Sequence, residues 1–445
     1  MKNIKNYNLE ELKQELINMG EKPFRAEQIF NWIYRENVTS FDDMTNLSLN
    51  LREKLKENYT LCIFNILRKQ VASDGTIKYL FDVLDGNAIE TVLMKYHHGY
   101  SLCVSSQIGC KMGCKFCAST GIAFIRSLTS GEIVEELLAV ERDENIKISN
   151  VVFMGIGEPL DNYDNVVNAI RIINNPKGIN IGARHISVST SGLVPMIYKL
   201  AEENIQCTLS ISLHATTDEK RSSMMPVNNR YNIEELMKAC KDYIKTTNRR
   251  ISFEYALAKD NNDNLDDAKQ LVKLLKGMIC HVNLIPINKI ENGKFDKSSN
   301  ENILKFRDYL NDHGIVATVR RELGSDIDAA CGQLRRKNLW CSIGTGSFRY
   351  MYQKDPVLLV HYQLFSKSNN FFKLSPKFKI SLAKIEPINP LIPKTGTKKK
   401  IKLILTNKSI ILIKRTLTWA SSPFKMLSTT ISTYIKGIRG ANIFI

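Results

Sequence analysis

The sequence predicts an α/β fold, in which a small helical domain precedes a parallel sheet that is either open or closed into a barrel. Apolar residues at helical spacing dominate residues 8–60. From about residue 75 onward, short apolar strands alternate with amphipathic helical segments, and turn residues separate them. Because repeated β/α units build parallel sheets, these observations place a helical domain at 1–75 and a β/α domain at 76–340.

The helical domain is predicted from two segments with start and stop signals. In the first, apolar residues recur at helical spacing between Asn8, a candidate N-cap, and Gly20, a candidate stop. In the second, Pro23 stands at a helix start, ahead of further apolar positions. We expect these apolar residues to form a local core: Leu9, Leu12, Leu16, Ile17, Phe24, Ile29, Phe30 and Ile33.

The β/α domain begins with short strands between residues 78 and 107, where DGN and HHGY mark turns. Further strands are predicted at 151–157, 185–190, 207–215, 251–258, 281–288 and 316–323. Helices are predicted between them, at 129–144, 194–204, 232–245, 264–277 and 300–312. In such a fold the chemistry gathers at the carboxyl ends of the strands, where this chain places most of its distinctive polar residues.

Charge is distributed unevenly along the chain. The net charge of +17 suggests nucleic-acid binding, but residues 341–445 hold 18 of the 62 basic residues and only two of the 45 acidic ones. The globular part is therefore nearly neutral, and RNA binding has to be argued from local patches. For the tail we prefer an appendage with little structure, such as out-of-frame or read-through sequence; the alternative is a basic RNA-binding extension.

The N-terminus lacks the apolar core of a signal peptide, and no apolar run is long enough to span a membrane. We therefore expect a cytoplasmic protein without membrane contact. In that compartment, clustered cysteines indicate metal or redox chemistry rather than disulfides. Isolated cysteines are expected to be small buried apolar residues: Cys62, Cys207, Cys240 and Cys280.

The strongest motif is GCKMGCKFCAST, which spaces Cys110, Cys114 and Cys117 within eight residues. Three thiolates on one loop can occupy three corners of an iron–sulfur cubane and leave one iron open. A structural zinc would need a fourth ligand, which Cys103 could supply from the preceding strand. Both readings remain open on spacing alone.

Further motifs add a resemblance. The CxxxCxxC spacing after a first strand resembles the radical S-adenosylmethionine (SAM) enzymes. With SSQIGCKMGCKFCAST, FMGIGEPL, VSTSGLVP, SISLHA, HVNLIPIN and SDIDAACGQL in order, the chain resembles the RlmN family of RNA adenine-2-C methyltransferases from about Glu21 to Leu334. One departure is Ile156, where the family more often has Met. The resemblance implies a partial, open TIM-type β/α barrel.

The resemblance also implies site residues. Cys110, Cys114 and Cys117 would hold one [4Fe-4S] cluster. The positions that match SAM-binding residues of the family are Gly157, Glu158, Ser189, Ser212, Leu213, His214 and Asn288. Cys331 matches the cysteine that becomes S-methylated, Cys103 its disulfide partner, and Glu90 the proton acceptor.

The implied mechanism follows from the chemistry of adenine. Carbon 2 lies between two ring nitrogens and is not a nucleophile, so it cannot attack the methyl group of SAM directly. In the family, one SAM methylates Cys331 and a second, bound to the open iron, yields a radical that activates that methyl group for addition to carbon 2. Cys103 then releases the RNA by forming a disulfide with Cys331, which requires thiolates.

The implied partners are 23S rRNA, modified in the peptidyl-transferase centre, tRNA, modified beside the anticodon, and a reducing donor such as flavodoxin or ferredoxin. The protein is expected to be a monomer. Candidate phosphate contacts are Arg249-Arg250, Arg320-Arg321 and Arg335-Arg336-Lys337. Two alternatives remain: a Cfr-type methyltransferase that acts on carbon 8, and an RNA-binding protein stabilised by zinc.

Overall fold

The computed structural model describes residues 1–121, 123–287, 295–324, 326–327, 399–406 and 409–416. The chain divides into two units, Met1–Asn338 and Leu339–Ile445, which are described separately. Among the described helices, none combines the length and the apolar character that a bilayer crossing requires.

The first unit opens with short helices, as predicted. They are η1 (Ile4–Asn6), α1 (Leu9–Asn18), α2 (Phe24–Tyr34), η2 (Phe41–Asp43) and α3 (Leu49–Asn58). Asn8 caps α1 in a capping box with Glu11, which satisfies backbone donors at the start of that helix. Most of the expected core residues are buried, but Ile17 is 46% exposed and Phe24 is also exposed.

A ten-stranded sheet forms the centre of the unit, in the order β14-β13-β12-β11-β10-β9-β6-β5-β4-β3. The strands are β3 (Asn65–Val71), β4 (Ile77–Asp82), β5 (Ala88–Tyr96), β6 (Gly99–Cys103), β9 (Ile148–Phe153), β10 (Ile186–Thr190), β11 (Thr208–Ser212), β12 (Ile251–Leu257), β13 (Cys280–Pro286) and β14 (Ala317–Val319). From β6 to β14 neighbouring strands run parallel, whereas β3 to β6 form an antiparallel meander. Among the described residues, β3 and β14 are the two edges, so the predicted α/β fold with an open barrel is confirmed.

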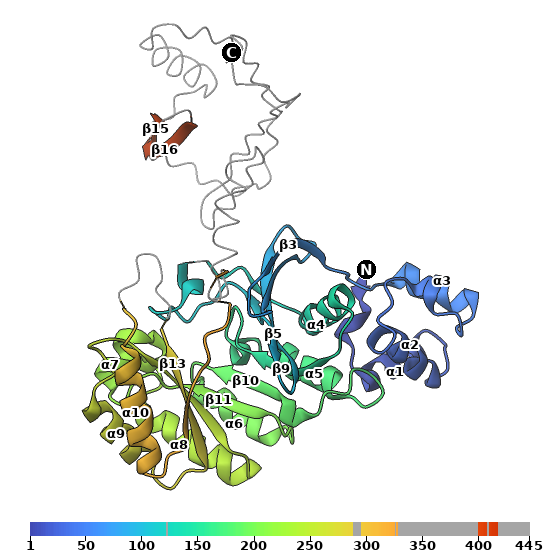
Figure 1. The fold of residues 1–445 in the computed structure, drawn as a ribbon. Coiled ribbons are helices and arrows are strands. Elements are labelled where there is room, and N and C mark those ends of the chain that lie inside the picture. Colours follow the sequence, from blue (N-terminus) through green and yellow to red (C-terminus); the bar gives the residue numbers. More distant parts are fainter. Residues whose placement is uncertain (122, 288–294, 325, 328–398, 407–408, 417–445) are drawn as a thin grey trace, which may run out of the picture. The chain divides into compact units, whose positions relative to one another are not determined.

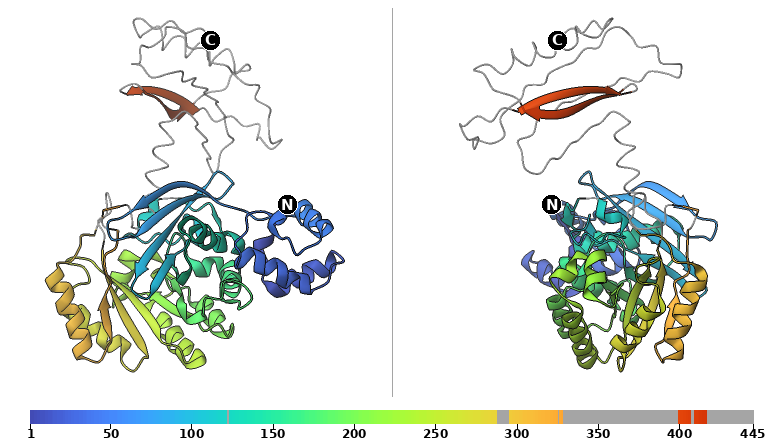
Figure 2. Two further views of the ribbon diagram at one scale, coloured as in Figure 1. Left: turned by 45° about the vertical axis from the view of Figure 1, so that its right-hand side comes forward. Right: turned by 90° about the vertical axis from the view of Figure 1, so that its left-hand side faces the viewer.

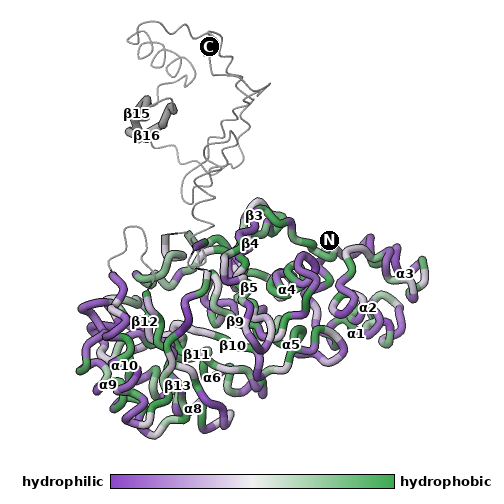
Figure 3. Tube along the Cα trace, in the orientation of Figure 1, coloured by the Kyte–Doolittle hydropathy of each residue, from purple (hydrophilic) through white to green (hydrophobic). Residues whose placement is uncertain are grey.

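Helices follow the parallel strands and lie along the outside of the sheet (Figures 1 and 2). They are α4 (Ser130–Glu144), α5 (Tyr163–Asn174), α6 (Val194–Glu202), α7 (Asp218–Met224), α8 (Ile233–Thr247), α9 (Leu265–Leu275) and α10 (Asn300–Asp312). Hydrophobic and hydrophilic residues alternate along helices such as α9 and α10, which bury one face each (Figure 3). The helices pack along the sheet, and the loops that follow the strands lie at the carboxyl edge of the sheet.

Several elements differ from the sequence-based prediction. Strand β3 lies inside the range 1–75 that was assigned to the helical domain. All its side chains but that of Gln70 are exposed, so it lacks the alternation by which strands are predicted. Helices α5 and α7 were not predicted, although the buried residues of α5 recur at helical spacing. Of the cysteines expected to be buried, Cys207 and Cys240 are, whereas Cys62 and Cys280 are only partly buried.

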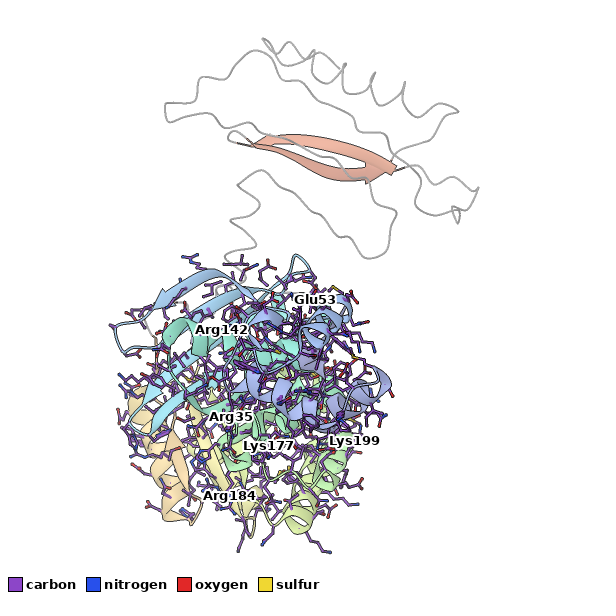
Figure 4. The ribbon with its side chains drawn as sticks, turned by 90° about the vertical axis from the view of Figure 1, so that its right-hand side faces the viewer. Arg35, Glu53, Arg142, Lys177, Arg184 and Lys199 are labelled. Atoms are coloured by element: carbon purple, nitrogen blue, oxygen red, sulfur yellow. The ribbon has the colours of Figure 1, made fainter. Side chains whose placement is uncertain are left out.

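Buried charges join the N-terminal segment to α4. The Lys5 ammonium forms an ion pair with Glu135, and both side chains are fully buried. Arg142 pairs with the same carboxylate and donates to Asn37 Oδ1 at 2.5 Å. Arg35 donates to the backbone carbonyl of Pro176 at 2.7 Å; Arg35 and Arg142 are labelled in Figure 4. The helical segment is therefore fastened to the β/α body by specific polar contacts.

The described part of the second unit is an antiparallel hairpin of β15 (Lys399–Thr406) and β16 (Ser409–Thr416). Its two strands coincide with the weakly alternating stretch IKLILTNKSIILIKR, for which little structure was expected.

Candidate active site

The three clustered cysteines lie on a tight loop after the short strand β7 (Gln107–Ile108), which pairs with β8 (Arg126–Ser127). Gly109 begins the loop with φ +83°, and a Cβ there would lie 2.2 Å from the carbonyl oxygen of Ala123. The Thr120 hydroxyl donates to the Cys114 carbonyl at 2.6 Å, and the Lys115 N–H donates to the Met224 carbonyl at 2.9 Å. The loop is therefore closed on itself and held against the end of α7.

The thiols of this loop lie close enough to interact electrostatically. Burial, together with a charge on Cys117, raises the pKa of Cys110 to about 12. Burial and the charges of Cys117 and Cys110 raise the pKa of Cys114 in the same direction. A bound metal group with positive charge would favour the thiolate forms of these three buried cysteines.

The spacing of these side chains bears on the kind of metal group that fits. Thiolates on one zinc ion lie ~3.8 Å apart, given Zn–S bonds of about 2.3 Å. Within the described ranges, no three Cys, His, Asp or Glu side chains converge on a single metal position. A cubane places its cysteine ligands on different irons, so it does not require three thiols to converge on one metal position.

The turn after β9 lies directly against the segment after β6. Gly157 has φ +114°, and a Cβ there would lie 2.6 Å from Ser106 Oγ and 2.8 Å from the Gln107 nitrogen. The absence of a side chain at Gly157 thus lets the turn after β9 pack closely against the backbone of Ser106 and Gln107. The Glu158 N–H donates to Gln107 Oε1 at 3.0 Å, which fixes the turn beside the cysteine loop.

The buried Glu158 carboxylate links the ends of β9 and β10. It accepts the N–H of Leu160 at 3.1 Å and the N–H of Ser191 at 2.7 Å. Burial raises its pKa, and these donated hydrogen bonds oppose the shift. Each carboxylate oxygen can accept a second hydrogen bond, so the group is able to receive an ammonium as well.

The Ser212-Leu213-His214 turn follows β11 and faces the cysteine loop. The His214 ring meets the Phe116 ring at 4.7 Å between centroids, nearly edge to face. Its Nδ1 accepts the Ala256 N–H at 2.9 Å, and burial lowers its pKa to about 3, so the ring is neutral with the proton on Nε2. Ser189 belongs to β10, one strand away, and is paired in register with Ser210 of β11.

Arg221, in α7, was missed by the sequence analysis. It is fully buried and donates to the carbonyls of Ser191 at 2.7 Å and of Ser212 and Leu213 at 3.1 Å, and to Asn228 Oδ1 at 3.0 Å. Burial lowers its pKa to about 10, against the opposing influence of the Cys114 and Asp218 charges. An arginine in the polar stretch DEKRSSM is usually a surface residue, so no sequence signal singles it out.

The other predicted catalytic residues lie on the inner face of the sheet. Cys103 ends β6, with Val92 and Val152 as its register partners on either side. Burial raises its pKa to about 11, whereas the charges of Arg320 and Lys78 lower it. Glu90 of β5 pairs with Lys78 of β4 at 2.9 Å. The structure thus brings Glu90 and Cys103 to one face.

Two of the predicted site residues, Asn288 and Cys331, lie outside the described residues, as do Arg335-Arg336-Lys337. Of the other arginine pairs, Arg249-Arg250 immediately precede β12 and therefore lie at the amino edge of the sheet, opposite the cysteine loop. Arg320-Arg321 follow β14 at the carboxyl edge and are exposed. Only this second pair lies where the candidate site opens.

Comparison with known proteins matches two parts of the chain to family models. Residues 2–61 match the ribosomal RNA large subunit methyltransferase N-terminal domain, and residues 104–275 match the radical SAM superfamily. A radical SAM methyltransferase from Sphaerobacter thermophilus superposes with a TM-score of 0.71 at 44% identity, over 75% of this chain and 99% of that one.

Curated relatives extend the match over most of the chain. A probable dual-specificity RNA methyltransferase RlmN from Clostridium novyi is 54% identical over 337 residues, which is 76% of this chain and 98% of the relative. One from Thermoanaerobacter sp. is 53% identical over 340 residues, covering 99% of its length. The resemblance drawn from the motifs is confirmed, and the chain belongs to the RlmN family of radical SAM methyltransferases.

Proposed function

We propose that this protein methylates carbon 2 of adenosine in 23S rRNA and in tRNA by a radical SAM mechanism. The observation that carries the proposal is the cysteine loop held at the carboxyl edge of the sheet, with Phe116 against His214, in a chain of the RlmN family. The match of residues 104–275 to the radical SAM superfamily favours an iron–sulfur cluster over the zinc alternative.

Cys110, Cys114 and Cys117 would hold the [4Fe-4S] cluster and leave one iron for SAM. Together, cluster and two SAM molecules per turnover would supply the methyl carbon and the radical chemistry. Around them, the chain's own residues orient SAM: polar groups at strand ends offer partners for an ammonium, a carboxylate and ribose hydroxyls. In our proposal these residues are Gly157, Glu158, Ser189, Ser212, Leu213, His214 and Asn288.

The two remaining cysteines act on the substrate side. Cys331 would carry the methyl group, and Cys103 would attack its sulfur to release the RNA. Because Cys103 is held in a setting that raises its pKa to about 11, the nearby positive charges matter for forming its thiolate. Glu90 would accept the proton of carbon 2.

A deletion strain tests the substrate and the position. Mass spectrometry of its rRNA and tRNA nucleosides should show loss of 2-methyladenosine, restored by the full chain. Unchanged 2-methyladenosine, or loss of 8-methyladenosine instead, would refute the assignment and favour the carbon-8 alternative. The purified Cys103→Ala variant should trap a covalent RNA–protein adduct that the Cys331→Ala variant does not form.

We also propose that the protein is a cytoplasmic monomer reduced by a flavodoxin or a ferredoxin. Light scattering on the reconstituted protein checks the monomer. Methylation assays with each reduced donor identify which one supports turnover.

A further inference from the structure

A lysine shares the inner face of the sheet with the two groups proposed to finish the reaction. Lys78 of β4 is paired in register with Val92 of β5, and Val92 is paired with Cys103 of β6. The backbones of Lys78 and Cys103 are therefore two strand spacings apart, about 9.6 Å. Side chains of residues opposite one another in a sheet point to the same face, so both lie on the inner face with Glu90, the residue paired with Leu80.

The Lys78 ammonium is 2.9 Å from the Glu90 carboxylate, and the side chains are 0% and 2% exposed. Burying both ions costs several kcal/mol, and such pairs often add nothing to stability compared with apolar residues of the same volume. Because stability alone does not explain this buried ion pair, and its carboxylate is the proposed proton acceptor, we look for a functional reason for Lys78.

Several charged groups act on the Cys103 thiol from the elements around it. Arg320, after β14, and Lys78, in β4, favour its thiolate, while Glu136 of α4 and burial oppose it. Glu136 accepts the Ser105 N–H and the Thr91 hydroxyl, so it is engaged with the opposite face of β5. Lys78 is thus the cation that acts on Cys103 and also contacts Glu90.

We propose that Lys78 is a positioning residue for the release of the methylated base, holding Glu90 in place for proton removal and stabilising the Cys103 thiolate. This inference rests on the function proposed above. It begins from the adduct in which the methylene carbon on Cys331 is bonded to carbon 2, once the unpaired electron left by radical addition has been passed on, as the iron–sulfur cluster would allow by accepting one electron.

Two steps then follow. Glu90 takes the proton of carbon 2 and becomes a neutral acid, and the electron pair of the C–H bond restores the aromatic ring. The Cys103 thiolate forms a bond to the Cys331 sulfur as the bond between that sulfur and the methylene carbon breaks. The electron pair of the broken bond stays on the methylene carbon, which takes up a proton and becomes the methyl group. Lys78 takes no covalent part in either step and stabilises first one anion and then the other.

The test compares Lys78→Met and Lys78→Arg in the reconstituted holoenzyme with an RNA substrate. Lys78→Met should form the covalent RNA adduct but release 2-methyladenosine at least about 100-fold more slowly, the low end of what a general base contributes. Lys78→Arg keeps the charge and should release the product. The matched control is Lys69→Met, on the neighbouring strand β3, where a 34% exposed lysine pairs with Asp143; it should behave as wild type.

The pH profile separates positioning from a merely structural role. Removing the Lys78 charge raises the pKa of the Cys103 thiol, so the rise of release with pH should be displaced to higher pH in Lys78→Met than in wild type. Should Lys78→Met load too little cluster, Lys78→Gln keeps a polar partner for Glu90 without the charge, and it should also stall at the adduct.

Release by Lys78→Met or by Lys78→Gln at the wild-type rate, or stalling of Lys78→Arg as severe as that of Lys78→Met, would overturn the inference. Failure of the proposed function would give a different result. Wild type would then yield no 2-methyladenosine, and the Cys103→Ala variant would trap no adduct.

Discussion

Phe116, which lies between Cys114 and Cys117 in the chain, meets His214 at 4.7 Å between ring centroids. This contact joins a loop after the first parallel strand to a turn more than ninety residues later in the chain. The His214 backbone has φ +57°, a left-handed conformation, and its Nδ1 is held by the Ala256 N–H. The imidazole is therefore fixed and neutral where it faces the cysteine loop.

We predict that His214 makes the protein sensitive to acid. Burial, assisted by the Arg221 charge, lowers its pKa to about 3, below the unfolded value near 6.5. Between these pH values the unfolded chain binds a proton that the folded chain does not, so stability is complete above about pH 6.5 and falls below it. At pH 5 the loss should be ~2 kcal/mol. Urea unfolding of wild type and His214→Asn at pH 5 and 8 checks this, since asparagine tolerates the left-handed backbone. Equal acid sensitivity of the two proteins would contradict the prediction.

Replacing Arg221 should both destabilise the fold and weaken SAM binding. Arg221→Met removes four donated hydrogen bonds and leaves the carbonyls of Ser191, Ser212 and Leu213 without that donor. We expect a loss of ~3–5 kcal/mol, and a smaller loss for Arg221→Lys, which lacks the planar fork. Arg171→Met is the control: its side chain is 50% exposed, and the change should stay within about 0.5 kcal/mol. Urea unfolding and SAM titration measure both effects.

The proposed cluster ligands can be tested by measuring bound iron. Alanine at Cys110, Cys114 or Cys117 should abolish bound iron and the iron–sulfur absorbance band after anaerobic reconstitution, because the remaining thiolates cannot hold a cubane. Cys280→Ala is the matched control, as this partly exposed thiol begins β13 at the opposite edge of the sheet. Full iron content in any of the three loop variants would argue against the assignment.

Glu135 provides a stability prediction for the helical segment. Glu135→Gln leaves the fully buried Lys5 ammonium without its anion, which should cost ~3–5 kcal/mol. Asp164→Asn breaks an ion pair with Lys199 in which the carboxylate is 90% exposed, and it should cost under about 1 kcal/mol. Chemical unfolding of both variants gives the comparison. A Glu135→Gln effect as small as the control would mean that Lys5 loses its charge at little cost.

Local patterns in the sequence were enough to predict the fold and most of the site's location. Apolar periodicity locates β10 to β13, and parallel strands bring their carboxyl ends to one edge, which is where the motifs gather. Arg221 and Lys78 could not be found in this way. Each lies in an ordinary stretch of sequence, and its interest comes only from contacts that the fold creates, between Arg221 and Ser191 and between Lys78 and Glu90. Strand β3 was missed because its exposed side chains carry no alternation.

The last prediction concerns the basic tail. Relatives are matched over 98–99% of their length by about three quarters of this chain, and the tail carries nearly all of the net positive charge. If the tail takes no part in catalysis, truncation after about residue 345 should leave iron content, SAM cleavage and RNA methylation unchanged. Truncation before Cys331 is the matched control: it should still bind iron but yield no 2-methyladenosine, because the thiol proposed to carry the methyl group is gone. If truncation after about residue 345 instead weakens RNA binding, and the loss of affinity is largest at low salt, the tail is an RNA-binding extension.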